Sequence, residues 1–234
     1  MKKITQKFIT IFALLFVICF TANAQNNYSL SFSNDIVNFN TINNFPQTEF
    51  TVSFWENINS TAVEQAIISY ADSDSNNEFL FIYISGGLLI HIGGNFLFIS
   101  TTHSMNTWDY VTLTWNSITG DLMLFRNGVL ESQSIFQQGF SISPTGCLVF
   151  GQDQDTCGGN FESNQALYGN LDNIQIWNTV LTQTEIQSNM NCESTGDEGL
   201  VGSWNFNEGS GDTVYDISGN GNHGVINDAT FSED

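Results

Sequence analysis

Basic residues are what this 234-residue sequence most clearly lacks, because it has four Lys and Arg against 24 Asp and Glu. Three of the four cations, Lys2, Lys3 and Lys7, lie at the very start, so Arg126 is the only Lys or Arg in the remainder. From residue 25 onward one cation faces 24 acids, a net charge of −23. Nucleic-acid binding is excluded, because neutralising phosphates needs Lys and Arg, and an anionic membrane surface would repel the chain.

Long hydrophobic runs are also scarce. The longest, Phe8 to Phe20, is shorter than the stretch of about 18 apolar residues that a membrane-spanning helix needs. It follows a basic start and precedes Ala22-Asn23-Ala24, a pattern typical of a secretory signal peptide over residues 1–24, cut before Gln25. A membrane anchor is the competing interpretation. We expect a protein that is secreted or held at the cell surface, without membrane insertion.

Cysteine is limited to four residues. Cys19 would leave with the signal peptide, so Cys147, Cys157 and Cys192 would remain, an odd number. Export permits a disulfide, and Cys157 could bond to Cys147 or to Cys192, with the third thiol free or intermolecular. The pairing is open. No C-x-x-C or His/Cys cluster predicts a zinc site.

Short segments of alternating apolar residues are what the sequence does contain. Tyr28 to Phe39 is predicted to be an opening hairpin around Ser33-Asn34-Asp35, and Asn127-Gly128 predicts a type I′ hairpin turn. The only helical pattern is near residues 182–189, where Thr182 and Glu185 form a capping box. The sequence therefore predicts an all-β protein, a two-sheet antiparallel sandwich with one short helix.

Acidic and amide side chains crowd the Gly-rich loop inside Leu148 to Trp177. Asp153, Asp155 and Glu162 lie there among several Asn and Gln residues, and the stretch contains no Lys, Arg or His. Carboxylate and amide oxygens without a counter-charge suit Ca²⁺, which takes six to eight oxygen ligands. A solvated acidic loop is the alternative.

The order of residues in this loop is similar to a known family. Gly151-Gln152-Asp153-Gln154-Asp155, followed by Gly158 to Glu162 and later Gly169-Asn170-Leu171, resembles the calcium loop of the pentraxin domain. Upstream, Ser69-Tyr70-Ala71 and Asn76-Asn77-Glu78 resemble the other calcium segment of the family. The resemblance runs from about Tyr28 to Met190. It implies a concanavalin A-like, laminin-G-like jelly roll over residues 25–192.

The resemblance also implies a set of metal ligands. Asp153 matches an acidic ligand of the family, Gln154 the residue that offers its backbone carbonyl, and Asp155 the carboxylate that bridges two calcium ions. Glu162 and Gln165 match ligands of the second, weaker ion. One or two Ca²⁺ ions are therefore expected.

The upstream segment departs from the family pattern at one ligand. Asn77 matches the Asn of the family, but Asn76 stands where the family has Asp. One negative charge is lost from the first calcium site, so its affinity should fall. Asp74 could compensate if the loop folds back.

The function implied is lectin-like: bound calcium would recognise a glycan or an anionic surface ligand, and family members often form cyclic homo-oligomers. Phosphocholine is disfavoured, because Ile82 and Phe96 stand near its contact positions and the acidic contact is missing. A glucanase of the same fold is the enzymatic alternative, but the E-x-D-x-x-E strand that such enzymes resemble is absent. No enzyme activity is expected. A third class is a structural or adhesive domain that calcium only stiffens.

The C-terminal piece, residues 199–234, resembles the opening of laminin-G-like repeats in its strand-like Leu200 to Phe206 and its turn Asp216 to Gly224. Either a second repeat begins here or the piece folds back onto the first domain. We favour folding back, because an unpaired Trp/Phe strand would promote aggregation. Asp216 and Asn220 could bind another calcium, although Asn-Gly sequences usually form only turns.

Overall fold

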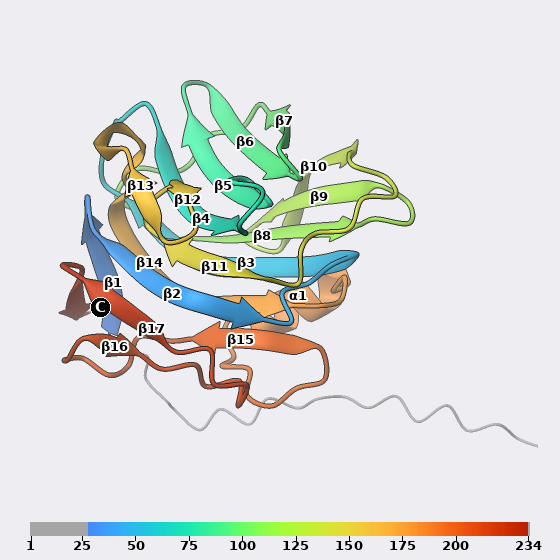
Figure 1. Ribbon diagram of the computed structural model, residues 1–234. Coiled ribbons are helices and arrows are strands. Elements are labelled where there is room, and N and C mark those ends of the chain that lie inside the picture. The colour runs from blue at the N-terminus through green and yellow to red at the C-terminus, as the bar shows by residue number, and fades with distance from the viewer. Residues whose placement is uncertain (1–27, 234) are drawn as a thin grey trace, which may run out of the picture.

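Two antiparallel sheets, each of eight strands, carry the alternating segments of the sequence. The computed structural model describes residues 28–233, and the predicted signal peptide, residues 1–24, lies outside them. The apolar faces of the two sheets meet in the core (Figure 1). The prediction of an all-β, two-sheet antiparallel sandwich is confirmed.

Sheet A contains the strand that carries the end of the acidic loop. In spatial order it comprises β10 (Val129–Ile135), β9 (Asp121–Arg126), β8 (Asp109–Asn116), β3 (Glu49–Ile58), β14 (Tyr168–Trp177), β1 (Tyr28–Ser33) and β18 (Thr230–Glu233), with β15 (Leu200–Trp204) also paired to β14.

Sheet B carries the start of that loop. In spatial order it comprises β16 (Thr213–Val214), β17 (Gly224–Asn227), β2 (Ile36–Asn43), β11 (Thr145–Phe150), β4 (Gln65–Ala71), β5 (Phe79–Ile84), β6 (Gly87–Ile92) and β7 (Asn95–Ile99). Along the chain, β11 and β14 are connected by the hairpin of β12 (Gln154–Thr156) and β13 (Gly159–Phe161), followed by the 3-10 turn Ser163–Gln165. Helix α1 (Gln183–Asn189) follows β14.

Aromatic pairs join the two sheets across the core. Phe50 and Phe54 of β3 meet Phe79 and Phe81 of β5 edge to face, with ring centroids 5.1 and 5.3 Å apart. Each such pair stabilises the fold by about 0.5–1.5 kcal/mol beyond the apolar area that it buries. The period-two alternation of the strands makes this contact possible, because it places every second side chain on the inner face.

The predicted opening hairpin over Tyr28 to Phe39 is wrong. β1 pairs with β14 and β18 in sheet A, whereas β2 pairs with β11 and β17 in sheet B. Asn34, at φ 73°, lies in the turn that carries the chain from one sheet to the other. Phe32 and Phe39 therefore reach the same core from opposite sides, an arrangement that alternation alone cannot distinguish from a hairpin.

Two local predictions are confirmed. Asn127 and Gly128 have φ values of 50° and 70°, both positive as a type I′ turn requires, and they join β9 to β10. Helix α1 begins after Thr182, whose hydroxyl accepts the Glu185 N–H while the Glu185 carboxylate accepts the Thr182 N–H. Within residues 28–233, no helix combines the length and apolarity needed to cross a bilayer.

The C-terminal strands belong to both sheets. β15 pairs with β14, β18 with β1 and β17 with β2. The turn ahead of β17 is organised by Asp216, whose Oδ1 accepts the N–H groups of Ser203 and Ser218 and whose Oδ2 accepts that of Asn222. Both carboxylate oxygens thereby hold the turn in place against β15.

Candidate metal centre

The acidic loop begins on the outer face of sheet B. Ile68 and Tyr70 of β4 point into the core, so Ser69 between them points outward. Its hydroxyl donates to Asp153 Oδ1 over 3.4 Å and accepts the N–H of Gln154 over 3.3 Å. The loop is therefore anchored to the middle of a central strand.

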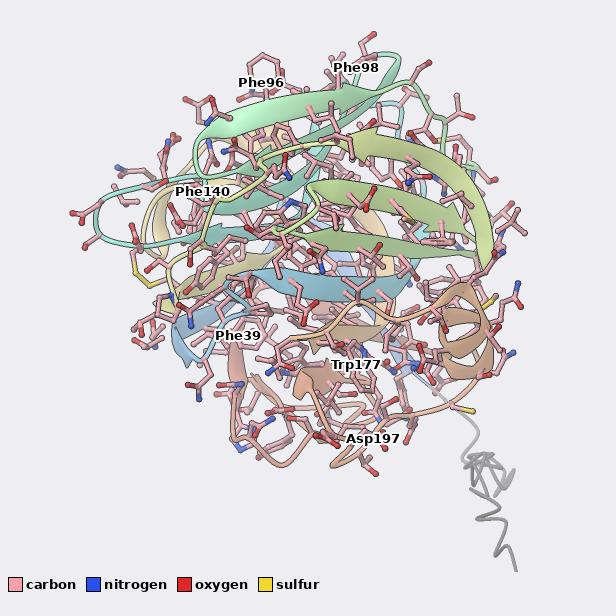
Figure 2. The ribbon with its side chains drawn as sticks, turned by 90° about the vertical axis from the view of Figure 1, so that its right-hand side faces the viewer. Phe39, Phe96, Phe98, Phe140, Trp177 and Asp197 are labelled. Carbon is pink, nitrogen blue, oxygen red and sulfur yellow. A yellow bond between two sulfur atoms is a disulfide. The ribbon has the colours of Figure 1, made fainter. Side chains whose placement is uncertain are left out.

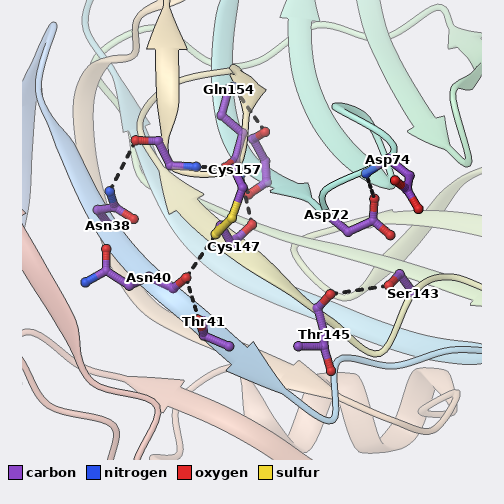
Figure 3. Close-up of a disulfide and its surroundings, with 12 residues drawn as sticks. Asn38, Asn40, Thr41, Asp72, Asp74, Ser143, Thr145, Cys147, Gln154 and Cys157 are labelled. Carbon is purple, nitrogen blue, oxygen red and sulfur yellow. Dashed lines mark hydrogen bonds between the residues drawn. A yellow bond between two sulfur atoms is a disulfide. The ribbon is translucent and has the colours of Figure 1, made fainter.

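Gln154 holds the loop in shape through its whole side-chain amide. Nε2 donates to the carbonyls of Ser69 and Cys147 over 2.9 and 3.0 Å, and Oε1 accepts the N–H of Gly158 over 2.7 Å. A disulfide between Cys147 and Cys157 ties the same loop to β11 (Figure 3). Of the pairings that the sequence left open, this is the one formed, and no cysteine of the described chain is free.

Asp153 has an uncompensated negative environment. It is only 5% exposed. The pKa of its carboxyl is raised to about 7: burial is the largest cause and the nearby Asp155 and Glu162 add to it, whereas hydrogen bonds from Ser69 and the Gln154 backbone oppose the rise. Three predicted ligands thus lie close enough to repel one another, with no cationic group among the causes of the shift.

The upstream loop between β4 and β5 meets this group. Asn76 Nδ2 donates to Asp155 Oδ1 over 3.3 Å. A pocket of about 460 Å³ separates the two loops; it is lined by Asp72, Ser73, Asp74, Ser75, Asn76, Asp155, Thr156 and Cys157. Asp72 was not a predicted ligand, and Asp74 was expected only to compensate for the charge missing at Asn76.

Two further amides belong to the predicted ligand set, and Gln165 is the one of the two that a hydrogen bond joins to the acidic loop. Asn77 Oδ1 is buried and, among residues 28–233, has no hydrogen-bond partner. Gln165 Nε2 donates to Asp153 Oδ2 over 3.4 Å, and Glu162, just before the 3-10 turn, is exposed. Of the seven predicted ligands, the structure joins Gln165 to Asp153 and Asn76 to Asp155 by direct hydrogen bonds.

The donor set fits calcium better than a transition metal. In the part of the chain that the structure describes, no group of three or more His, Cys, Asp and Glu side chains could hold a metal by itself. Calcium, however, also accepts amide and backbone carbonyl oxygens. The unbonded Asn77 Oδ1 is such an oxygen, and the amides of Asn76 and Gln165 would present theirs after half a turn about the last side-chain bond.

A second cluster of acids, around Arg126, was not predicted from the sequence. Arg126 Nη1 lies 3.3 Å from Glu56 Oε1 and 3.2 Å from Asp109 Oδ2, and its Nε lies 3.2 Å from Glu131 Oε2. Arg126 therefore pairs with three acids at once. The only Lys or Arg of the described chain is therefore unavailable to the acidic loop.

Comparison with known proteins gives one family and a consistent fold. A family model described as the Pentaxin family matches residues 27–207. C-reactive protein of Rattus norvegicus is 31% identical over 124 residues, which are 53% of this chain and 54% of that protein. The chain spans about half to two thirds of the length of the curated relatives it matches first.

Two solved structures show the same fold. The native heptameric SAP-like pentraxin from Limulus polyphemus has a TM-score of 0.66 and 22% identity, over 86% of this chain and 95% of that one. A putative carbohydrate binding protein from Bacteroides ovatus has a TM-score of 0.70 and 17% identity, over 88% of this chain and 60% of that one. At these identities the likeness concerns the fold alone.

Proposed function

Because this chain belongs to the Pentaxin family, whose model matches residues 27–207, we propose that it is a secreted, non-catalytic module that binds its ligand through loop-bound calcium. One observation carries the proposal. Asp153, Asp155 and Glu162 gather on the outer face of sheet B with no cationic side chain, while Arg126 is held elsewhere by three acids. A divalent cation from solution would relieve this repulsion.

The proposed ligands of one or two Ca²⁺ ions are the carboxylates of this group, the amide oxygens of Asn76, Asn77 and Gln165, and the backbone carbonyl of Gln154. Bound calcium would supply positive charge and coordination positions for ligand oxygens. The disulfide and the Gln154 hydrogen bonds hold the loop in place for this task, which lowers the entropy cost of ordering it around an ion.

The proposed ligand is a glycan or another anionic surface molecule, and the neighbouring surface favours a glycan. From Ser69 a row of outward positions runs across sheet B through Leu80 and His91 to Phe96. Phe96 and Phe98 are 64% and 48% exposed (Figure 2). Exposed rings suit the apolar face of a sugar, and this row lacks an acid for a choline group.

A homo-oligomer is proposed on the likeness to the Limulus protein, whose structure is heptameric. Light scattering of the purified protein in calcium and in EDTA would measure its mass directly. A mass equal to one chain in both conditions would remove this part of the proposal and leave the calcium site unaffected.

Retention on a glycan array tests the function. Wild type and Asp197→Asn, which removes an exposed acid far from the loop, should retain glycans in calcium and lose them in EDTA, and Asp155→Asn should retain none. Calcium-dependent stabilisation without any retained ligand would indicate a structural domain instead. Hydrolysis of β-glucan that survives chelation would indicate the glucanase.

A further inference from the structure

A buried carboxylate stands in the inner row of β3. Phe50, Val52 and Phe54 of this row lie in the core, and the next inward residue is Glu56, which is 1% exposed. Transferring an ionised carboxylate from water into such a position is costly unless it is fully paired and hydrogen-bonded. The contacts of Glu56 therefore decide its charge state.

One carboxyl oxygen of Glu56 has hydrogen-bond donors, and the other has none in the described chain. Oε1 accepts the hydroxyl of Tyr83 over 2.7 Å and Nη1 of Arg126 over 3.3 Å. Oε2 is buried and has no hydrogen-bond partner in the described chain. A neutral carboxyl with one unpartnered oxygen costs less to bury than a carboxylate with one.

The guanidinium that faces Glu56 is shared. Arg126 also contacts Asp109 and Glu131, and its Nη2 lies 3.4 Å from the Tyr83 hydroxyl. With Glu56 ionised, three carboxylates compete for one cation. With Glu56 neutral, one negative charge remains in excess instead of two. The pKa of Glu56 is raised to about 7: burial is the largest cause and Asp109 adds to it, while Tyr83 and Arg126 oppose the rise.

The same cluster links both sheets at the end where β7 and β10 are the terminal strands. The bond from Tyr83 of β5 to Glu56 of β3 crosses from sheet B to sheet A. Glu131 lies on β10, so its contact with Arg126 holds that terminal strand.

The segment between β7 and β8, residues 100–108, closes over the cluster. The hydroxyl of Thr101 donates to Glu131 Oε1, and the N–H of Ser104 donates to Asp109 Oδ2 over 3.2 Å. The ring of His103 lies 4.8 Å from that of Tyr83. Burial and Arg126 lower the pKa of His103, and Asp109 opposes them, so this histidine adds no second cation near neutral pH.

We propose that the Glu56–Arg126 cluster is a proton-dependent latch. A proton on Glu56 leaves Arg126 to hold Asp109 and Glu131, which keeps β10 and residues 100–108 against the sandwich. Loss of that proton puts a third carboxylate on the guanidinium and loosens both segments. Tyr83, Asp109, Arg126, Glu131 and His103 are the groups that face Glu56 or its partners.

Hydrogen exchange at a series of pH values from 5.5 to 8.5, corrected for the intrinsic pH dependence of amide exchange, tests the latch in the calcium-loaded protein. We expect protection of β10 and residues 100–108 to fall about tenfold as the pH passes 7, with β4 and β11 unchanged. Glu56→Gln should keep full protection throughout. Tyr83→Phe should move the midpoint to higher pH, because the lost hydrogen bond favoured the carboxylate.

An identical pH profile in wild type and Glu56→Gln would overturn the latch, as would constant protection in wild type. If Glu56→Gln does not fold, ¹³C NMR of wild type labelled only at Glu carboxyl carbons decides the question without a variant. A buried Glu that titrates near pH 7 supports the latch. If every Glu titrates below about pH 5.5, the latch is wrong. Asp153 is silent in this experiment because it is not a Glu.

Discussion

Two groups of three acids lie in different parts of the molecule, and only one of them has a cationic side chain among its contacts. At the end of the sandwich where β10 is the terminal strand, Glu56, Asp109 and Glu131 surround Arg126. On the outer face of sheet B, Asp153 lies beside Asp155 and Glu162 with no arginine or lysine. A chain with a single cation after its first 24 residues places it in the interior group.

The difference separates a structural role from a binding role. An arginine is covalently part of the chain, so the interior group always keeps its cation and its contacts can join strands of both sheets. A solution cation can be exchanged and keeps coordination positions for another molecule. The outer group is therefore the one suited to hold a ligand, and the inner one is suited to stabilise the sandwich.

Removing the interior cation should have the largest effect. Arg126→Met leaves the buried Glu56 and Asp109, and the exposed Glu131, without their partner, so we expect the free energy of unfolding to fall by about 3–5 kcal/mol. Urea denaturation measures it. Arg126→Lys should recover only part of the loss, because an ammonium cannot reproduce the planar contacts of a guanidinium. If the loss stays below about 1 kcal/mol, the interior group behaves like an ordinary surface ion pair.

When calcium is chelated, the free energy of unfolding should depend on pH through both Glu56 of the interior group and Asp153 of the outer group. The pKa values of Glu56 and Asp153 are each raised to about 7 in the folded chain, from 4.5 and 3.8. Such groups stabilise the fold fully below their unfolded pKa, and this contribution is lost as the pH rises through about 7. We expect each to contribute about 3–4 kcal/mol between pH 4 and 8.

Calcium should separate the two contributions. Once an ion neutralises the outer group, the pH dependence due to Asp153 should disappear and that of Glu56 should remain. Thermal unfolding at several pH values, with calcium and with EDTA, measures the difference. Profiles that do not depend on calcium would mean that the outer group binds no ion.

Asp153→Asn should stabilise the protein in EDTA and destabilise it in calcium. In EDTA at pH 8 the variant removes a repelled, buried carboxylate, so we expect it to be more stable than wild type by about 1–2 kcal/mol. In calcium the order should reverse, since wild type gains about 2.7 kcal/mol at an ion concentration 100 times its Kd. Destabilisation in both solutions would assign Asp153 a purely structural role.

The smallest change in stability is expected at the exposed ring. Phe96→Ala should alter the free energy of unfolding by less than about 0.5 kcal/mol, because the side chain buries little area. Calcium affinity should be unchanged, while glycan retention should fall. Val129→Ala, an exposed apolar residue on β10 of the other sheet, is the matched control and should leave retention intact.

Features set by neighbouring residues could be predicted from the sequence, and features set by strand pairing could not. The Asn127-Gly128 turn depends on two positive φ values, which residue type determines locally. Asp153 and Asp155 share one loop, so their proximity was expected. Their approach to Asn76 was expected only through the family resemblance, because the two loops are far apart in sequence.

The interior group shows why contacts between distant strands could not be predicted from the sequence. Glu56 lies on β3 and Arg126 on β9, 70 residues apart, and their contact depends on β8 lying between these strands. No pattern around either residue indicates the other. The same limit explains the error at Tyr28 to Phe39, since alternation shows which side chains face the core but not from which sheet.

Calcium titration by calorimetry tests most directly whether the outer group takes its cation from solution. Wild type and Asp197→Asn should bind one or two ions with saturable heat, in the 10⁻⁴–10⁻³ M range of extracellular modules or tighter. Asp155→Asn should bind at least about tenfold more weakly, because it loses a ligand charge. No saturable binding by wild type, or equal binding by Asp155→Asn, would contradict the proposal.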